Sequence, residues 1–225
     1  MEGKQNITIP LAIIFAGALI AGAIYFGTRS KAPATSQIAD STAPKEFRVD
    51  PVGSSDHILG NPDAEITIIE YSDLECPWCK VFHNTMRQIV SDYHGDIAWV
   101  YRHLPYHSKA PKEAEAAECA ANLGGNDIFW KFIDKVFATT NSNDSLDPAE
   151  LPKIATSLGL HAVKFNTCLG DGTNTDRVRK YINAAIDSQL GTPYSVIITK
   201  RGEQDYINGA QTYATIKSQI DQLLK

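Results

Sequence analysis

The sequence predicts an α/β protein in which a strand–helix–strand unit, a helical segment and a strand–strand–helix unit follow an N-terminal membrane-spanning helix. Three observations lead to this fold class: an uncharged apolar run at 7–26, two strand-like segments flanking an amphipathic helix between 66 and 104, and a hairpin pattern before a last helix. Of the 225 residues, 43% are hydrophobic, and the net charge is −5. This composition is typical of a globular chain and argues against a nucleic-acid binder with a basic surface.

The apolar run at 7–26 is long enough to cross a bilayer. Its residues, at about 1.5 Å each in a helix, would span about 30 Å, the thickness of the hydrocarbon core. A cleaved signal peptide is the alternative, because Ala21-Gly22-Ala23 resembles a cleavage site. That site lies inside the run, whereas the apolar part of a signal peptide usually has only about 7 to 15 residues. We therefore expect an uncleaved anchor at 7–26, preceded by a short segment at 1–6.

The next segment, 27–46, is rich in Ala, Ser, Thr and Pro and has no helical or strand period, which predicts a flexible linker. Residues 47–225 are then expected to form the folded domain. Arg29 and Lys31 follow the apolar run while Lys4 precedes it, so the positive-inside rule taken alone slightly favours a cytoplasmic domain.

The folded domain begins with a strand–helix–strand pattern. Ile66–Ser72 is rich in β-branched residues and predicts a strand, entered through a turn at Asn61-Pro62-Asp63. A helix and a second strand at Ile97–Leu104 follow, and this order implies parallel pairing with a right-handed crossover. The apolar positions at helical spacing in between are Val81, Phe82, Met86, Ile89, Val90 and Tyr93.

A helical insertion is expected at about 109–190. Asp147 predicts an N-cap, with Pro148 at the first helical position and Gly159 as the stop of that helix. A further helix is expected to end at Gly191. Its apolar face comprises Val178, Tyr181, Ile182, Ala185 and Ile186.

The C-terminal part predicts a hairpin followed by a helix. Val196–Thr199 and Asp205–Ile207 are strand-like, and the segment 200–203 between them reads as the connecting turn. The last helix has its apolar residues on one face, which fits packing against a sheet. These residues are Tyr213, Ile216, Ile220, Leu223 and Leu224.

The segment Cys76-Pro77-Trp78-Cys79 lies where the first strand ends and the helix begins. A helix N-terminus offers unpaired N–H groups and the positive end of the helix dipole, which stabilise a thiolate and lower its pKa. Pro77 suits the first helical position, and a spacing of three places both sulfurs on one face of the helix. We therefore expect Cys76 to be an exposed nucleophile and Cys79 its shielded partner.

Two other interpretations of this cysteine pair remain. His83 extends it to a C-x2-C-x3-H pattern, but a structural zinc site needs four ligands and no second ligand pair follows at the usual spacing. An inert structural disulfide is the other alternative. The position of the pair beside a strand–helix–strand unit favours redox chemistry, with no metal and no bound cofactor.

Three separated segments resemble the DsbA-like, thioredoxin-fold disulfide oxidoreductases and occur in the family's order. They are DHILGNPDAEITIIEYSDLECPWCKVFH, RHLPYHSKAPKEAEAAECAANLGGNDIFW and GTPYSVIIT, and the resemblance covers 56–225. It is strongest to the membrane-anchored or secreted bacterial branch, and it implies a thioredoxin fold with an inserted helical domain. It also implies exported protein substrates and re-oxidation by a quinone-linked membrane thiol oxidase. We therefore set the charge bias aside and expect a single-pass membrane protein with an extracytoplasmic catalytic domain.

The resemblance also implies roles for individual residues. Cys76 would be the nucleophile, and Thr192 and Pro193 would form the loop whose proline is cis, packs against the active disulfide and presents the Thr192 backbone to an extended substrate. Without the resemblance, this loop reads as a helix stop followed by a turn. Glu70, in a strand covered on both faces, would have a raised pKa and exchange a proton with Cys79. A glutamate on an edge strand that reaches solvent is the alternative.

Trp78 departs from the family pattern, because strongly oxidising members have His at this position. A protonated His would stabilise the Cys76 thiolate and strengthen the oxidising power, whereas an indole has no charge. The reduction potential therefore stays open. Pro77 and Trp78 are candidates for contacts with substrate, and partial burial of Trp78 against the core is the alternative.

Cys119 and Cys168 both fall in the helical insertion. The even number of cysteines and the expected oxidising compartment favour a structural disulfide between them, with two buried free thiols as the alternative. Closing this loop would restrict the unfolded chain by about 4 kcal/mol. His103 and His107 follow the second strand without an evident partner and are assigned no role.

These expectations combine into a predicted function as a dithiol oxidase. A substrate thiolate would attack Cys76 of the Cys76–Cys79 disulfide, and the second thiol of the substrate would then release the reduced enzyme. A reductase or isomerase that keeps the pair reduced is one alternative. A non-catalytic peptide-binding or chaperone module is the other.

Overall fold

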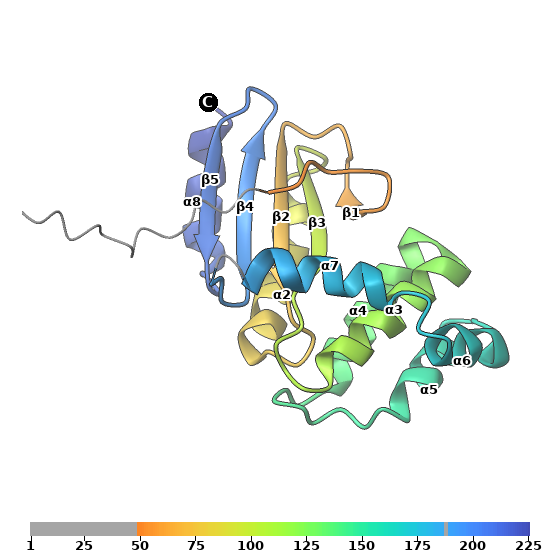
Figure 1. Cartoon of the computed structure of the whole chain (residues 1–225). Helices are drawn as coiled ribbons and strands as arrows, with labels where there is room; N and C mark the ends of the chain where they lie inside the picture. Colours follow the sequence, from red (N-terminus) through yellow and green to blue (C-terminus); the bar gives the residue numbers. More distant parts are fainter. Residues whose placement is uncertain (1–48, 187–188) are drawn as a thin grey trace, which may run out of the picture. The chain divides into compact units, whose positions relative to one another are not determined.

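The computed structural model describes residues 49–186 and 189–225 (Figure 1). The predicted membrane anchor at 7–26 and linker at 27–46 lie outside this part of the chain. Within the described ranges, no helix is long and apolar enough to cross a membrane.

A five-stranded sheet with the order β1-β3-β2-β4-β5 is the centre of the fold. The central strands β2 and β3 are parallel, as predicted, and β2 pairs with β4 in the antiparallel sense. The outer strands β1 and β5 pair antiparallel with β3 and β4. The strands are β1 (His57–Gly60), β2 (Ile66–Ser72), β3 (Ile97–His103), β4 (Tyr194–Thr199) and β5 (Gln204–Asn208).

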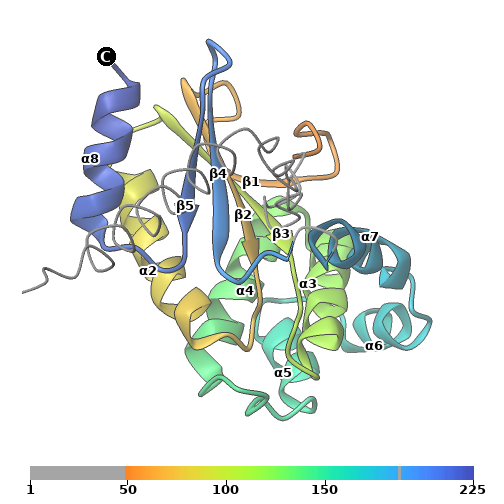
Figure 2. The same cartoon turned by 60° about the vertical axis from the view of Figure 1, so that its left-hand side comes forward.

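The helices fall into two groups. Figure 2 shows α2 and α8 on one face of the sheet and α7 on the other. The helices α3 to α6 gather beside the sheet, next to the β1 and β3 end, and with α7 they form the predicted insertion (Figure 1). Their bounds are α2 (Pro77–Asp92), α3 (Ala110–Gly124), α4 (Asn126–Thr139), α5 (Glu150–Ser157), α6 (Ala162–Gly170), α7 (Thr175–Ile186) and α8 (Tyr213–Leu223).

Strand β2 is buried on both faces because its side chains alternate between two cores. Ile66 and Ile68 pack in the larger core with Phe82 of α2. Ile69 and Tyr71 belong to a smaller core on the opposite face. A strand with helices on both faces reads as a nearly continuous apolar run, which is why its prediction from sequence was clear.

Three predicted boundaries or faces are wrong in detail. The helix expected from Pro148 begins at Glu150, because the Asp147 carboxylate accepts the Ala149 N–H and closes a turn before the helix. The helix expected to reach Gly191 is described as far as Ile186, and Gln189 already lies in a turn. On α2 the expected apolar face is not wholly buried, as described below. Strand β1, with four residues, was not predicted because so short a segment shows no period.

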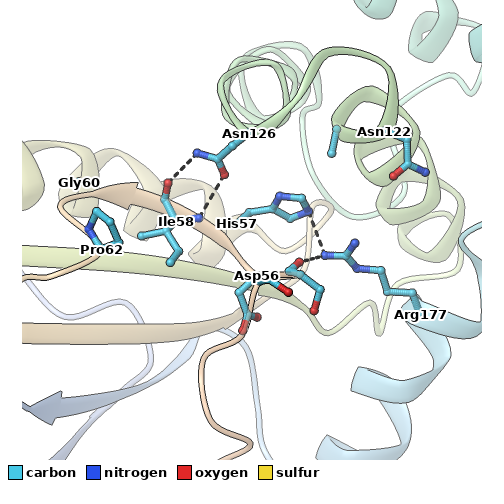
Figure 3. A pocket seen from close by; sticks show the side chains of 11 residues that line it. Asp56, His57, Ile58, Gly60, Pro62, Asn122, Asn126 and Arg177 are labelled. Carbon is cyan, nitrogen blue, oxygen red and sulfur yellow. Dashed lines mark hydrogen bonds between the residues drawn. The ribbon is translucent and has the colours of Figure 1, made fainter.

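A polar junction holds β1 against the helical insertion (Figure 3). The Asn126 side chain accepts the Ile58 N–H at 3.2 Å and donates to the Ile58 carbonyl at 2.8 Å. His57 and Arg177 both contact the buried Glu118 carboxylate, at 2.9 and 3.0 Å. A cavity of about 480 Å³ opens beside these residues, and the charged residues in its lining pair with Arg102 and Glu118 outside it.

Candidate active site

The two cysteines lie in the turn between β2 and α2. Cys76 is the N-cap residue of α2, and the helix begins with Pro77. The Lys80 N–H donates to the Cys76 carbonyl at 3.1 Å, which forms the first turn of the helix. Cys76 and Cys79 are both free thiols in this structure.

The exposure around the pair is uneven. Cys79 is fully buried, whereas Cys76 is 5% exposed, which is less than we predicted for the nucleophile. Its sulfur is covered by the Thr192 carbonyl, at 3.5 Å. Trp78 is 64% exposed and Val81, one turn along α2, is 53% exposed, so an apolar surface lies beside the nearly buried sulfur.

The surroundings shift the pKa values of the two thiols in opposite directions. A hydrogen bond from Cys79, together with the N–H groups of Cys79 and Trp78 at the helix start, lowers the pKa of Cys76 to about 6, although partial burial opposes this. Burial raises the pKa of Cys79 well above its ordinary value, and the Cys76 and Glu70 charges add to this effect. At neutral pH the pair therefore combines a thiolate with a protonated thiol.

Glu70 is fully buried in β2, between β3 and β4, which excludes the edge-strand alternative. It alternates with Ile69 and therefore faces the α2 side of the sheet. Trp99 donates its indole N–H to Oε2 at 2.8 Å, and Oε1 has no hydrogen-bond partner in the described structure. Burial, with a smaller contribution from the Cys76 charge, raises the pKa of Glu70 to about 7. The carboxyl group is therefore poised to take up or release a proton near neutral pH.

The loop before β4 covers the site from the other side. The peptide bond between Thr192 and Pro193 is cis. The Thr192 carbonyl contacts the Cys76 sulfur, and the Pro193 carbonyl accepts the Gly209 N–H at 3.0 Å. The structure therefore brings the predicted loop and the predicted nucleophile together.

Two buried acids in the turn were not singled out from the sequence. Asp73 and Glu75 are both fully buried. The Glu75 carboxylate accepts the Thr140 hydroxyl at 2.8 Å and the N–H groups of Ser145 and Leu146 at 3.0 Å each. This acid therefore fastens the active-site turn to the loop between α4 and α5. Two acids within the four residues before Cys76 were the signal that could have identified them.

A third buried acid, Glu113 of α3, lies against this turn. Burial and the neighbouring Glu75 carboxylate raise the pKa of Glu113 to about 9. Glu113 is therefore neutral at physiological pH, and its burial beside Glu75 adds no negative charge.

The histidines have partners that the sequence did not reveal. His107 Nδ1 lies 3.0 Å from the Asp73 carboxylate, and His103 Nε2 lies 3.5 Å from Glu118. His83 Nε2 lies 2.7 Å from Asp134. The described residues contain no group of three or more His, Cys, Asp or Glu side chains arranged to hold a metal ion.

The second cysteine pair is bonded. A disulfide joins Cys119 of α3 to Cys168 of α6, across 49 positions of the chain. The Asn174 amide donates to both sulfurs, at 3.3 and 3.6 Å. This disulfide holds two helices of the insertion together.

Comparison with known proteins identifies similar chains. A protein-family model described as thioredoxin matches residues 53–222. The chain is 32% identical to Pseudomonas aeruginosa DsbA2, whose crystal structure superposes with a TM-score of 0.65 over 78% of this chain and 97% of that one. Wolbachia pipientis α-DsbA1 is 25% identical, with a TM-score of 0.67 over 77% of this chain and 92% of that chain. Oxidised BdbD from Bacillus subtilis is 25% identical, with a TM-score of 0.65 over 75% and 92%.

Curated relatives match through one part of their length. The Na⁺/H⁺ antiporter NhaA 3 of Salinispora tropica is 35% identical over 162 residues, which are 70% of this chain and 24% of the antiporter. The Na⁺/H⁺ antiporter NhaA of Herminiimonas arsenicoxydans is 34% identical over 150 residues, or 67% of this chain and 23% of that protein. The chain therefore spans about a quarter of the length of the curated relatives it matches.

Proposed function

Because the chain belongs to the thioredoxin-like DsbA family of thiol–disulfide oxidoreductases, we propose that it is an extracytoplasmic dithiol oxidase that introduces disulfides into exported proteins. The observation that carries this proposal is the difference between the pKa values of the two thiols, since the pKa of Cys76 is lowered to about 6 and that of Cys79 is raised. A stabilised thiolate favours the reduced enzyme, and this makes the Cys76–Cys79 disulfide a stronger oxidant.

The reaction starts from the disulfide form of the enzyme. A substrate thiolate attacks the Cys76 sulfur, the bond between Cys76 and Cys79 breaks, and Cys79 leaves with the electron pair and takes up a proton. The second substrate thiolate then attacks the substrate sulfur of the mixed disulfide, and Cys76 leaves as a thiolate. Two electrons have passed from the substrate dithiol to the enzyme. The low pKa of Cys76 makes it the better leaving group in this second step.

Glu70 is the proposed proton donor and acceptor for Cys79. Its pKa of about 7 allows both protonation states near neutral pH, and its charge contributes to the raised pKa of Cys79, which supports proton exchange between the two groups. Protonated Glu70 can supply the proton when Cys79 leaves, and ionised Glu70 can accept it when Cys79 attacks.

The substrate is proposed to bind as an extended segment across the sulfur. The Thr192 backbone lies against Cys76 and is available for strand-like pairing. The exposed side chains of Trp78 and Val81, with Pro77 beside them, offer an apolar surface for neighbouring residues of the substrate. Unfolded exported chains expose such apolar segments before their disulfides form.

The proposed setting is the outer side of a cell membrane. The apolar run at 7–26 would be a single-pass anchor and 27–46 a linker that lets the domain at 47–225 reach its substrates. The disulfide between Cys119 and Cys168 fits an oxidising compartment. Re-oxidation of Cys76 and Cys79 would then need a membrane partner, for which we propose a quinone-linked thiol oxidase.

The test is the reduction potential of the Cys76–Cys79 pair, equilibrated against glutathione buffers and followed by the fluorescence of the neighbouring Trp78. A value around −120 mV, as in DsbA itself, is expected for an oxidase, and a value near −270 mV, as in thioredoxin, would overturn the proposal in favour of a reductase. Oxidation of a reduced dithiol peptide by stoichiometric enzyme gives the direction independently. A Cys76→Ala variant that kept the full effect of the protein in a cell-free assay of substrate folding would favour the non-catalytic alternative.

A further inference from the structure

We propose that His107 is a positioning residue for the redox pair: its protonated ring, held by Asp73, compensates a buried negative charge beside the sulfurs and so stabilises the Cys76 thiolate. This inference rests on the proposed function only in taking Cys76 as the reacting thiolate, and it does not depend on the direction of electron flow.

Asp73 connects His107 to both sulfur-bearing residues. The Asp73 N–H donates to the Cys79 sulfur at 3.4 Å, and the Asp73 carbonyl accepts the Cys76 N–H at 3.1 Å. The side chain of the same residue turns toward the segment after β3. A change in the charge or position of Asp73 is therefore expected to alter the pKa values of the two cysteine thiols.

The Asp73 carboxylate is fully buried and accepts several hydrogen bonds. Oδ1 accepts the Glu75 N–H at 2.7 Å, and Oδ2 accepts the N–H groups of Tyr106 and His107 at 2.6 and 2.9 Å. These backbone donors stabilise the carboxylate but bring no opposite charge. Among the described residues, the ion pair recorded for Asp73 is with the His107 ring, whose Nδ1 lies 3.0 Å from Oδ2. A buried carboxylate without this partner would disfavour a second negative charge nearby.

The groups that face His107 favour its protonated form. Burial of the ring opposes protonation, but the Asp73 carboxylate, Asp144 of the loop between α4 and α5, and Cys76 at the start of α2 together raise the pKa of His107 above its ordinary value. Of the two further acids near Asp73, Glu113 is neutral at physiological pH, as described above, and the Glu75 carboxylate accepts hydrogen bonds from Thr140, Ser145 and Leu146. The protonated form of the ring is therefore favoured by three anionic groups that converge on it.

His107 supplies a charge that the helix start lacks. The residue between the cysteines is Trp78, which has no charge, whereas an imidazolium near the thiolate lowers the free energy of the reduced state. The hydrogen bonds at the helix start are the principal influence on the pKa of Cys76. We therefore expect His107, in the segment after β3, to lower the pKa of Cys76 by a smaller amount, through its contact with Asp73.

The experiment compares His107→Gln with His107→Lys in the full chain. The readouts are the pKa of Cys76, from the pH dependence of its alkylation by iodoacetamide, and the equilibrium constant with glutathione. His107→Gln is expected to lower the thiolate-to-thiol ratio of Cys76 about threefold to tenfold. The glutathione equilibrium should shift by the same factor toward the disulfide, tenfold being about 30 mV.

His107→Lys keeps a positive charge and removes the ring, so it should stay within about twofold of the wild type in both readouts. The exposed His161, at the start of α6, provides the matched control, and His161→Gln should change neither value. Equal shifts in His107→Gln and His107→Lys would overturn the proposal, because the ring would then act only as a structural support. An unchanged pKa of Cys76 in folded His107→Gln would overturn it as well.

A double-mutant cycle adds a second reading. With Asp73→Asn the buried charge is gone, so adding His107→Gln should change the thiolate-to-thiol ratio less than about twofold. A full effect of His107→Gln in that background would contradict the role of Asp73. If Asp73→Asn does not fold, the Gln and Lys variants decide alone. Failure of the wild-type enzyme to oxidise a dithiol peptide would reject the proposed oxidase but leave these pKa comparisons intact.

Discussion

The two cysteine pairs of this chain differ in their surroundings more than in their exposure. Cys76 is 5% exposed and Cys79 is fully buried, while Cys119 is fully buried and Cys168 partly buried. The first pair lies at a helix N-terminus among ionisable groups and is present as thiols, whereas the second joins α3 to α6 and receives hydrogen bonds from the neutral amide of Asn174. Redox reactivity in this chain therefore follows from the helix start and the neighbouring charges rather than from solvent access.

The largest effect should come from removing the reactive sulfur. Cys76→Ser is expected to reduce the rate of dithiol-peptide oxidation by about 1,000-fold or more, because a hydroxyl cannot form the mixed disulfide. The matched variant Cys119→Ala/Cys168→Ala should retain the activity per folded molecule within about threefold. A comparable loss in the folded matched variant would break the distinction between the two pairs.

The free energy of unfolding should decrease on loss of the second cysteine pair rather than of the first. Cys119→Ala/Cys168→Ala is expected to lower the free energy of unfolding by about 2 to 5 kcal/mol, since the unfolded chain regains the freedom of a long loop. Urea denaturation, monitored by far-UV circular dichroism, measures this change. Reducing only the Cys76–Cys79 disulfide should increase the free energy of unfolding, because the native state stabilises the Cys76 thiolate. Destabilisation on selective reduction would contradict the assignment of Cys76.

Glu70→Gln should affect the Cys76–Cys79 pair only. It should slow, by about 10- to 100-fold, the steps in which Cys79 gains or loses a proton. With a pKa of about 7, Glu70 is an acid below that pH and a base above it. At a fixed concentration of the attacking thiolate, attack on the Cys76–Cys79 disulfide should therefore slow as pH rises through about 7, because Glu70 loses the proton that it gives to Cys79. Release of the mixed disulfide by Cys79 should accelerate over the same range. Stopped-flow fluorescence of the full chain measures both steps.

The variant Glu65→Gln, which changes an exposed glutamate just before β2, is the control for that series and should leave the pH profile unchanged. If Glu70→Gln kept the inflection near pH 7, another group would have to exchange the proton with Cys79.

A smaller effect is expected from Trp78→His. A cationic ring between the cysteines should stabilise the Cys76 thiolate and shift the glutathione equilibrium toward the reduced enzyme by about tenfold, or about 30 mV. The free energy contributed by the Cys119–Cys168 disulfide should not change. A potential that stayed constant or fell would show that the indole already stabilises the thiolate by other means.

The sequence predicted the parts of the molecule whose signals are local. Strand β2 has the predicted bounds Ile66–Ser72, and α2 begins directly after Cys76, because a β-branched run and a proline at the first helical position act over a few residues. The fold as a strand–helix–strand unit, an insertion and a strand–strand–helix unit followed from the same signals.

Long-range contacts could not be predicted in this way. Asp73 and His107 are 34 residues apart, and Glu75 reaches Ser145 across 70 residues, so no periodic pattern reports either contact. Val81 shows a different limit, since helical spacing identifies an apolar residue without telling whether it faces a core or an open surface.

The Asn126 side chain has a consequence for how this domain meets other chains. It occupies both the N–H and the carbonyl of Ile58, as a neighbouring strand would, at the outer edge of β1 (Figure 3). An exposed strand edge is a template on which unfolded polypeptides can add and aggregate. With four residues and this side-chain cover, β1 offers little length for such addition. This border of the sheet is therefore closed to the addition of an unfolded chain, whereas the proposed place of substrate contact is the loop beside Cys76.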